Sequence, residues 1–173
     1  MNTTTKTTTL TYLKNNTEAL ETVLADVSEA AFLSKPTSDT WSIAEIVEHI
    51  IKVETGVLGK IQQLGAAASE GKSIPSMANE DIMQRTGNRN ITVQAPKYFE
   101  PSGLFQDKST ALAAFKQNRT ITEKFVEMTE LDLKSIGFPH MLLGILNGEN
   151  WLVFIAGHSE RHVTQIKQLK EMT

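Results

Sequence analysis

The chain has 173 residues and a formal net charge of −3, and 40% of its residues are hydrophobic. It contains no cysteine, which excludes disulfides, thiolate-ligated metal sites and a cysteine nucleophile. The balanced charge leaves no basic footprint for nucleic acid or an anionic membrane. No apolar run approaches the roughly 20 residues that span a bilayer, and the polar residues 1–9 are no secretion signal. We therefore expect a cytoplasmic protein in which residues 1–173 form one domain.

An apolar stripe near the N-terminus predicts the first helix. Its members alternate three and four residues apart and are apolar except at one threonine: Leu10, Leu13, Thr17, Leu20, Leu24 and Val27. The helix is expected to end before Pro36, since a proline disfavours helical geometry in the residue before it. The threonine-rich residues 1–8 precede the stripe and are expected to be frayed.

The second helix begins with a recognisable signal. Ser42 and Glu45 have the spacing of a capping box, and Trp41 stands where a hydrophobic staple would. Apolar residues then recur at helical spacing from Ile43 to residue 64, and Gly65 is a plausible C-terminal stop.

Residues 66–107 differ from the rest because their periodicity is weak. A connection of this length in a compact domain is often functional, and its only β-leaning run is residues 90–94. A third helix restarts at Asp107, the Gly-Phe-Pro-His sequence at residues 137–140 breaks it, and a last helix begins near Asn150. Four long amphipathic helices with a long connection between the second and third predict an all-α four-helix bundle.

Two histidines of the last helix lie in the middle of its apolar stripe. With about 100° per residue, six side chains fall within about 80° of one another on the helical wheel: Trp151, Ile155, His158, His162, Ile166 and Leu169. A pair at i and i+4 can direct both imidazoles to one metal ion. The alternative is that both histidines are core residues bonded to carbonyls or facing side chains.

His49 supplies a third candidate ligand, at the edge of the stripe of the second helix. Together the three histidines would leave coordination positions open, which is typical of catalytic rather than structural metal sites. His140 is interpreted as a loop residue that could at most line the mouth of the site.

Four other polar residues are candidates for this surface. Glu45 lies one turn before His49 and is a candidate catalytic base, second-shell acceptor or extra ligand, although the capping box alone would explain it. Glu48 faces the opposite side and is expected to be a solvated charge. Asn118 and Thr122 lie on the apolar stripe of the third helix. They are candidates for contacting a cofactor or ligand in the bundle centre, or else bond across the core.

Two segments of the chain resemble one known family. Residues 39–50, Asp-Thr-Trp-Ser-Ile-Ala-Glu-Ile-Val-Glu-His-Ile, resemble the opening motif of the DinB-like proteins, also called YfiT-like metal-dependent hydrolases. Residues 151–166, which include both His158 and His162, resemble their closing motif, and the likeness extends from Leu10 onward. The resemblance implies a four-helix bundle in which His49, His158 and His162 hold a divalent metal. It also implies a bacterial, cytoplasmic protein that is often a homodimer.

Two classes of function follow from these residues. The first is a metal-dependent enzyme that uses Zn²⁺ or Ni²⁺ on a small-molecule substrate. A metal there can lower the pKa of bound water to about 7 for hydrolysis, or stabilise the thiolate of an external small thiol for transfer. The resemblance allows both, because some relatives are S-transferases acting with bacillithiol or mycothiol. The second class is a non-catalytic helical module that binds a hydrophobic ligand or a partner helix, with structural histidines.

Overall fold

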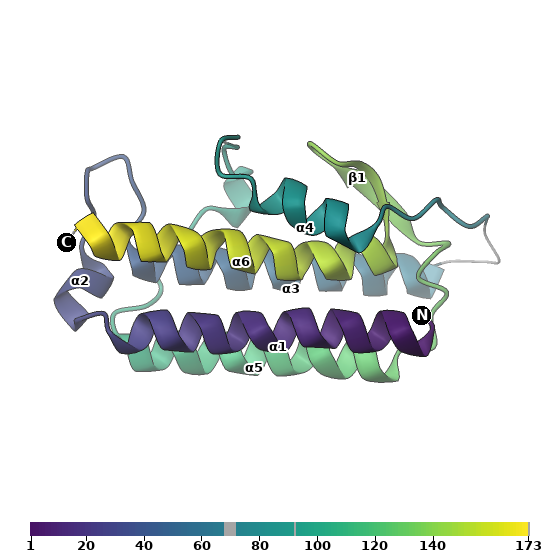
Figure 1. Ribbon diagram of the computed structural model, residues 1–173, viewed down its shortest axis with the longest axis horizontal. Helices are drawn as coiled ribbons and strands as arrows, with labels where there is room; N and C mark the ends of the chain where they lie inside the picture. Colours follow the sequence, from purple (N-terminus) through teal and green to yellow (C-terminus); the bar gives the residue numbers. More distant parts are fainter. Residues whose placement is uncertain (68–71, 92, 173) are drawn as a thin grey trace.

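Four long helices build the molecule, and the predicted all-α four-helix bundle is confirmed (Figure 1). The computed structural model describes residues 1–67, 72–91 and 93–172. The long helices are α1 (Thr3–Ala25), α3 (Ile43–Ala67), α5 (Lys108–Met128) and α6 (Gly148–Met172). Helices α1 and α6 run in one direction, and α3 and α5 run in the other. None of the described helices combines the length and apolarity that crossing a membrane requires.

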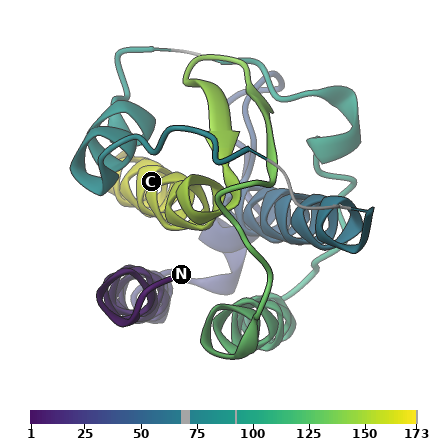
Figure 2. The same cartoon turned by 90° about the vertical axis from the view of Figure 1, so that its right-hand side faces the viewer.

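The four helices stand at the corners of a square when the bundle is viewed along its axis (Figure 2). Helix α1 packs against α5 and α6, and α3 packs against the same two helices. Helices α1 and α3 are therefore diagonal partners, as are α5 and α6. The arrangement makes α3, which carries His49, an antiparallel neighbour of α6, which carries His158 and His162.

Shorter elements cover the side of the bundle formed by α3 and α6 (Figure 2). They are α4 (Asn79–Gly87), the 3₁₀ helix η1 (Lys97–Phe99) and a hairpin of β1 (Gly137–His140) and β2 (Gly144–Asn147). The hairpin is antiparallel, with Gly137 opposite Asn147 and His140 opposite Gly144. A further short helix, α2 (Glu29–Leu33), follows α1.

The core consists of two apolar clusters, one toward each end of the bundle. Along each long helix the residues of one cluster give way to those of the other near a buried polar side chain. These side chains are Asn16, Glu54, Arg119 and Ser159. The histidine-bearing stretches of α3 and α6 lie close to this boundary between the two clusters.

Side-chain caps explain where the helices begin. The Ser42 hydroxyl accepts from the Glu45 amide at 3.2 Å, and the Glu45 carboxylate accepts from the Ser42 amide at 2.9 Å. This reciprocal pair is the predicted capping box. Asp107 caps α5 in the predicted place by accepting from the Thr110 amide at 2.8 Å.

Two expected helix boundaries differ from the structure, at the start of α1 and at Gly65. Residues 1–8, expected to be frayed, enter α1 at Thr3, because Asn2 accepts from the Thr5 amide and caps it. The first helix ends at Ala25, before Pro36 as expected, and Ser28 caps α2 as a separate element between them. Gly65 does not stop α3. It lies inside the helix, where a Cβ atom would come within 2.5 Å of Leu131.

The strands also lie elsewhere than the sequence indicates. Residues 137–140, interpreted only as a break, form β1, and Gly144 at a φ of +75° supplies the left-handed residue that its short loop needs. In the β-leaning run, residues 90, 91, 93 and 94 belong to no strand, and Thr92 lies outside the described residues.

Candidate metal centre

The structure brings the three predicted histidines together between α3 and α6. The Nε2 atom of His158 lies 3.2 Å from Nε2 of His49 and 3.2 Å from Nε2 of His162. The candidate ligand atoms of all three residues lie within 4.8 Å of one another. Three imidazole nitrogens from two helices therefore face one point.

Hydrogen bonds at the far side of two rings fix which nitrogen carries the proton. Nδ1 of His49 is 2.8 Å from the Phe99 carbonyl oxygen, and Nδ1 of His162 is 2.8 Å from Oε1 of Gln165. Because these oxygens only accept, we assign the proton to Nδ1 in both histidines. Their Nε2 atoms are left with bare lone pairs that point at the common centre.

His158 cannot satisfy both neighbours with a proton of its own. A single N–H on Nε2 can point at His49 or at His162, and the other contact then has no proton between its two nitrogens. A cation at the centre would resolve this conflict. Adjacent nitrogens on a tetrahedral zinc, with Zn–N bonds of about 2.0–2.1 Å, stand about 3.3 Å apart, so the 3.2 Å spacings fit such an ion.

The electrostatics of the site favour neutral imidazoles. Burial lowers the pKa of His49, although the bond to Phe99 opposes the change. Burial and the neighbouring His49 lower the pKa of His162 to about 3. Burial, His162 and His49 hold the pKa of His158 well below its usual range. The neutral form at neutral pH is the one that binds a metal.

Aromatic rings form part of the wall around the histidines. The centroid of the Trp41 ring lies 4.8 Å from that of His49, and Phe154 lies 5.5 Å from His158. Trp41 therefore contacts a candidate ligand, beyond its predicted place before the helix cap. His158 is less buried than His49 and His162, which are 5% and 7% exposed.

His140 stays outside the cluster. Its Nδ1 accepts from the Leu142 and Leu143 amides at 3.1 and 3.2 Å, within the hairpin loop. Its ring packs against Phe154 at 4.6 Å, and Phe154 in turn packs against His158. The predicted loop residue thus lies one aromatic ring away from the histidine cluster.

The capping box and an ion pair account for the two oxygens of Glu45. One accepts from the Ser42 amide, and the other pairs with Lys35 at 2.7 Å. Asn118 and Thr122 make contacts within the bundle: Asn118 accepts from Thr55 of α3 at 2.8 Å. The Thr122 hydroxyl is 3.4 Å from the Asn118 carbonyl oxygen.

Glu48 was expected to be a solvated charge, and that prediction is wrong. It is 1% exposed, because residues 102–104 of the long connection cover this face of α3. One carboxylate oxygen accepts from the Ser102 amide and hydroxyl at 2.8 and 2.7 Å. The other accepts from the Gly103 and Leu104 amides at 3.0 and 2.9 Å. Lys52 pairs with the carboxylate at 2.7 Å.

These contacts make Glu48 more acidic than an ordinary glutamate. Burial by itself would raise its pKa, but the Lys52 ammonium and the hydrogen bonds from Leu104 and Ser102 outweigh burial and lower the pKa from 4.5 to about 2. Glu48 is therefore a carboxylate at every pH at which the protein is expected to work.

The sequence patterns did not predict a buried ion pair that contacts α6 between its two histidines. Arg119 of α5 and Glu54 of α3 are each 1% exposed and lie 3.0 Å apart. Arg119 also donates to the Ser159 hydroxyl at 2.8 Å, between the two histidines of α6, and to the Leu13 carbonyl at 3.2 Å. Its position four residues after Phe115, on the apolar stripe of the third helix, is the signal that could have revealed it.

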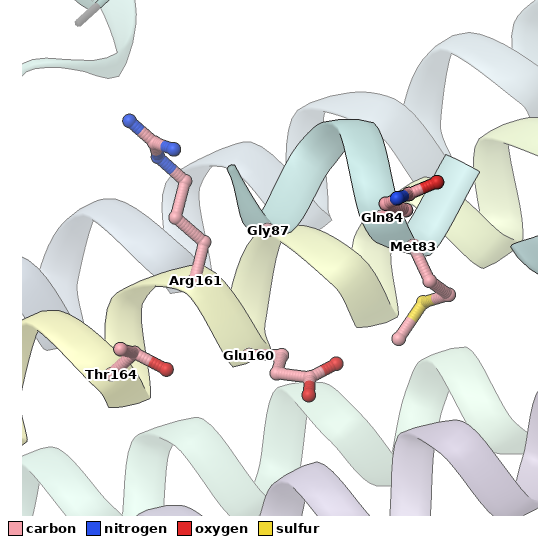
Figure 3. A pocket seen from close by; sticks show the side chains of 6 residues that line it. All are labelled: Met83, Gln84, Gly87, Glu160, Arg161 and Thr164. Atoms are coloured by element: carbon pink, nitrogen blue, oxygen red, sulfur yellow. The ribbon is translucent and has the colours of Figure 1, made fainter. Parts of the chain in front are cut away.

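A cavity of 260 Å³ between α4 and α6 contains none of the histidines (Figure 3). Its lining includes Glu160 and Arg161, whose side chains point in opposite directions. Arg161 donates to the carbonyls of Thr86 and Ile91, at 3.5 and 2.7 Å, and to that of Asn88. The arginine thus fastens the loop after α4 onto α6, and we do not assign the cavity to the metal site.

Comparisons with known proteins agree with this fold and place the chain in a family. The chain is 26% identical over 150 residues to the uncharacterized protein YuaE of Bacillus subtilis (strain 168), covering 86% of this chain and 88% of YuaE. The solved structure of TT2238, a four-helix bundle protein, matches with a TM-score of 0.62 at 18% identity, covering 94% of this chain and 98% of that one.

A second solved structure has the same fold. YfiT from Bacillus subtilis, described as a probable metal-dependent hydrolase with an unusual four-helix bundle topology, matches with a TM-score of 0.63 at 14% identity. The match covers 99% of this chain and 89% of YfiT. The DinB superfamily matches residues 12–166, which include both segments that carry the histidines. The chain belongs to the DinB superfamily.

Proposed function

We propose that His49, His158 and His162 bind one divalent metal ion, Zn²⁺ or Ni²⁺, and that the protein is a metal-dependent enzyme for a small-molecule substrate. The proposal is carried by the convergence of three Nε2 atoms. Two of them, in His49 and His162, are unprotonated because the proton is on Nδ1. The description of YfiT as a probable metal-dependent hydrolase supports it by analogy of fold.

The site would combine a Lewis acid with neutral imidazole ligands and the aromatic rings of Trp41 and Phe154. His49, His158 and His162 would hold the cation and leave coordination positions open, where it would supply Lewis acidity to a bound water or thiol. The protein's own part is to keep the imidazoles neutral through burial and to orient two rings through Phe99 and Gln165. Glu45 has no place in this proposal, since its carboxylate caps the helix.

Hydrolysis and thiol transfer remain two branches of the proposal. The chain has no cysteine, so a thiol nucleophile must come from a separate small molecule. The branches are separated by titrating the cobalt-loaded protein with a small thiol such as 2-mercaptoethanol. A new thiolate-to-cobalt absorption band supports transfer, and its absence at saturating thiol favours hydrolysis.

The metal site itself is tested by thermal unfolding with added metal. A ligand that binds only the native state stabilises it by about 2.7 kcal/mol at a hundredfold excess over Kd. For a domain of this size that corresponds to a rise in melting temperature of about 5 to 10 °C. We expect this rise for the tag-free wild-type protein with Zn²⁺ or Ni²⁺ at pH 7.5, and bound metal by elemental mass spectrometry.

The matched control is His158→Ala, which removes the central ligand and leaves the other two. Equal melting shifts in wild type and His158→Ala would show that the metal binds elsewhere. Absence of binding to wild type, with the fold intact, would favour the non-catalytic module.

We also propose that the protein acts as a homodimer and without nucleic acid. The family resemblance motivates the dimer, and the net charge of −3 offers no electrostatic footprint for nucleic acid. Light scattering at micromolar concentration should give the mass of two chains. A mass of one chain would contradict the dimer without affecting the metal site.

A further inference from the structure

One face of α3 is covered by a strap, which we define as residues 99–104. Four positions of α3 contact it, and they follow one another along the helix: Glu48, His49, Lys52 and Gly56. The strap begins at the last residue of η1 and ends shortly before α5. It is thus held between the long connection and the helix that carries the first candidate metal ligand.

The contacts of the strap with Lys52 and Gly56 fix its first residues. Lys52 donates to the Glu100 carbonyl at 2.8 Å. A Cβ atom at Gly56 would lie 2.6 Å from Cε1 of Phe99, so the absence of a side chain there lets the Phe99 ring pack directly on α3. These contacts hold the Phe99 backbone next to His49, with its carbonyl oxygen 2.8 Å from Nδ1 of the ring.

The remaining residues of the strap converge on Glu48. Gly103 has a φ of +78°, a conformation that favours glycine. Around this turn the amides of Ser102, Gly103 and Leu104 all donate to the Glu48 carboxylate, as does the Ser102 hydroxyl. A single carboxylate therefore organises three consecutive peptide groups.

We propose that Glu48 is a positioning residue for the metal site, acting through the strap on His49. It holds the strap so that the Phe99 carbonyl accepts the Nδ1 proton of His49, which leaves Nε2 free to bind a metal. The inference rests on the proposed function. Each carboxylate oxygen of Glu48 accepts two hydrogen bonds from the strap, and one also pairs with Lys52, so Glu48 does not act as a base toward substrate.

The first readout needs no metal. In apo protein, two-bond ¹H–¹⁵N correlation spectra distinguish the Nδ1–H and Nε2–H forms of each histidine. We expect His49 of the wild type to be the Nδ1–H form. Glu48→Gln keeps the shape of the side chain but turns an NH₂ group toward strap donors. We expect His49 of this variant to become a mixture of the two forms.

The second readout is zinc affinity measured against a chelator. Removing an outer partner of a metal-ligating histidine typically weakens metal binding 10- to 100-fold, and we expect a loss of at least about tenfold for Glu48→Gln. Glu45→Gln is the matched control, because it changes a glutamate of the same helix that bonds only Ser42 and Lys35. Its zinc affinity should stay within about twofold of wild type, since it leaves the outer partner of His49 in place.

The outcomes separate this inference from the proposed function. A Glu48→Gln protein that keeps the Nδ1–H form of His49 and wild-type zinc affinity would overturn the inference. If the wild type binds neither Zn²⁺ nor Ni²⁺, the proposed function fails, and the His49 form in apo protein still decides whether Glu48 positions that ring.

A milder variant covers the case in which Glu48→Gln does not fold. Ser102→Ala deletes one of the four hydrogen bonds to Glu48 and keeps the peptide amide. We expect a smaller change in the same direction, about threefold in zinc affinity. An unchanged His49 form and unchanged affinity in Ser102→Ala would then count against the inference.

Discussion

Two buried glutamates of α3 satisfy their charges in different ways. Glu48 accepts four hydrogen bonds from the strap. It also forms an ion pair with Lys52, whose side chain is partly exposed to solvent. Glu54 lies inside the bundle, where Arg119 binds one oxygen and the other has no hydrogen-bond partner among the described residues. Burial raises the pKa of Glu54 in spite of Arg119, whereas the pKa of Glu48 falls to about 2.

At Glu48 the ammonium of Lys52 and the strap donors outweigh the effect of burial on the pKa, whereas at Glu54 burial outweighs the ion pair with Arg119. Peptide amides fixed by the strap face the Glu48 carboxylate without carrying a charge that must itself be desolvated. The Glu54 pair buries two charges, and each depends on the other. We therefore expect Glu48 to tolerate the loss of its cation and Glu54 not to tolerate it.

The largest expected effect is that of Arg119→Met. This change leaves the Glu54 carboxylate buried without its partner, and such a loss costs about 3–5 kcal/mol. The equivalent change at the other glutamate, Lys52→Met, should cost about 1 kcal/mol or less, because the strap donors remain and the pair is partly exposed. Urea unfolding of both variants measures the two costs. Equal costs would break the comparison.

The double variant Glu54→Leu/Arg119→Met sharpens the result. Replacing both members of a buried pair by apolar residues is often neutral or stabilising. We expect its unfolding free energy to return to within about 1 kcal/mol of wild type. A double variant as unstable as Arg119→Met would assign the cost to packing instead of to the unpaired charge.

The next effect is a pH dependence that belongs to Glu48. Its folded pKa, about 2, lies below the ordinary value of 4.5, so the native state binds fewer protons than the unfolded state between these values. The stabilisation is therefore present above pH 4.5 and is lost as the pH falls toward 2. Its size is on the order of 3 kcal/mol, at about 1.4 kcal/mol per pKa unit.

The difference in unfolding free energy between wild type and Glu48→Gln isolates this contribution. It should be largest near pH 6 and should shrink steadily between pH 4.5 and 2. Glu54 has the opposite sign: because its pKa is raised, its contribution becomes less favourable as the pH rises above 4.5. A difference that is independent of pH would contradict the assignment to Glu48.

The smallest effect tests the packing of the strap on α3. Gly56→Ala places a methyl group 2.6 Å from the Phe99 ring, so the ring must move, and we expect a loss of about 1 kcal/mol. Gly59→Ala is the control in the same helix, because nothing lies within 4 Å of its Cβ position. It should gain about 0.5–1 kcal/mol from helix propensity. Melting curves of both variants should shift in opposite directions.

Sequence patterns predicted the parts of the site that depend on helical spacing. The pair His158 and His162 follows from the i, i+4 rule, and the capping box of Ser42 and Glu45 is a local signal. The burial of Arg119 could also have been inferred, because it is a charged residue on an apolar stripe. Its partner Glu54 could not be identified from spacing alone.

The surroundings of Glu48 could not be predicted in the same way. Glu48 and His49 point about 100° apart on the helical wheel, and the sequence gives no sign that peptide amides from residues 102–104 will cover Glu48. The hairpin was missed for a related reason. Its strands are four residues each, and one contains Pro139, so neither has the length or composition of a recognisable strand.

The diagonal placement of α1 and α3 has a consequence for how the chain folds. Helices α1 and α3 follow each other among the long helices but do not pack together, and the same holds for α5 and α6. Helix α1 packs only against the later helices α5 and α6 among the long helices, and His49 meets His158 across 109 positions of chain. Contacts so distant in sequence are formed slowly, so this protein should fold more slowly than bundles whose successive helices pair. Its histidine centre should assemble only after most of the chain has been closed into a loop.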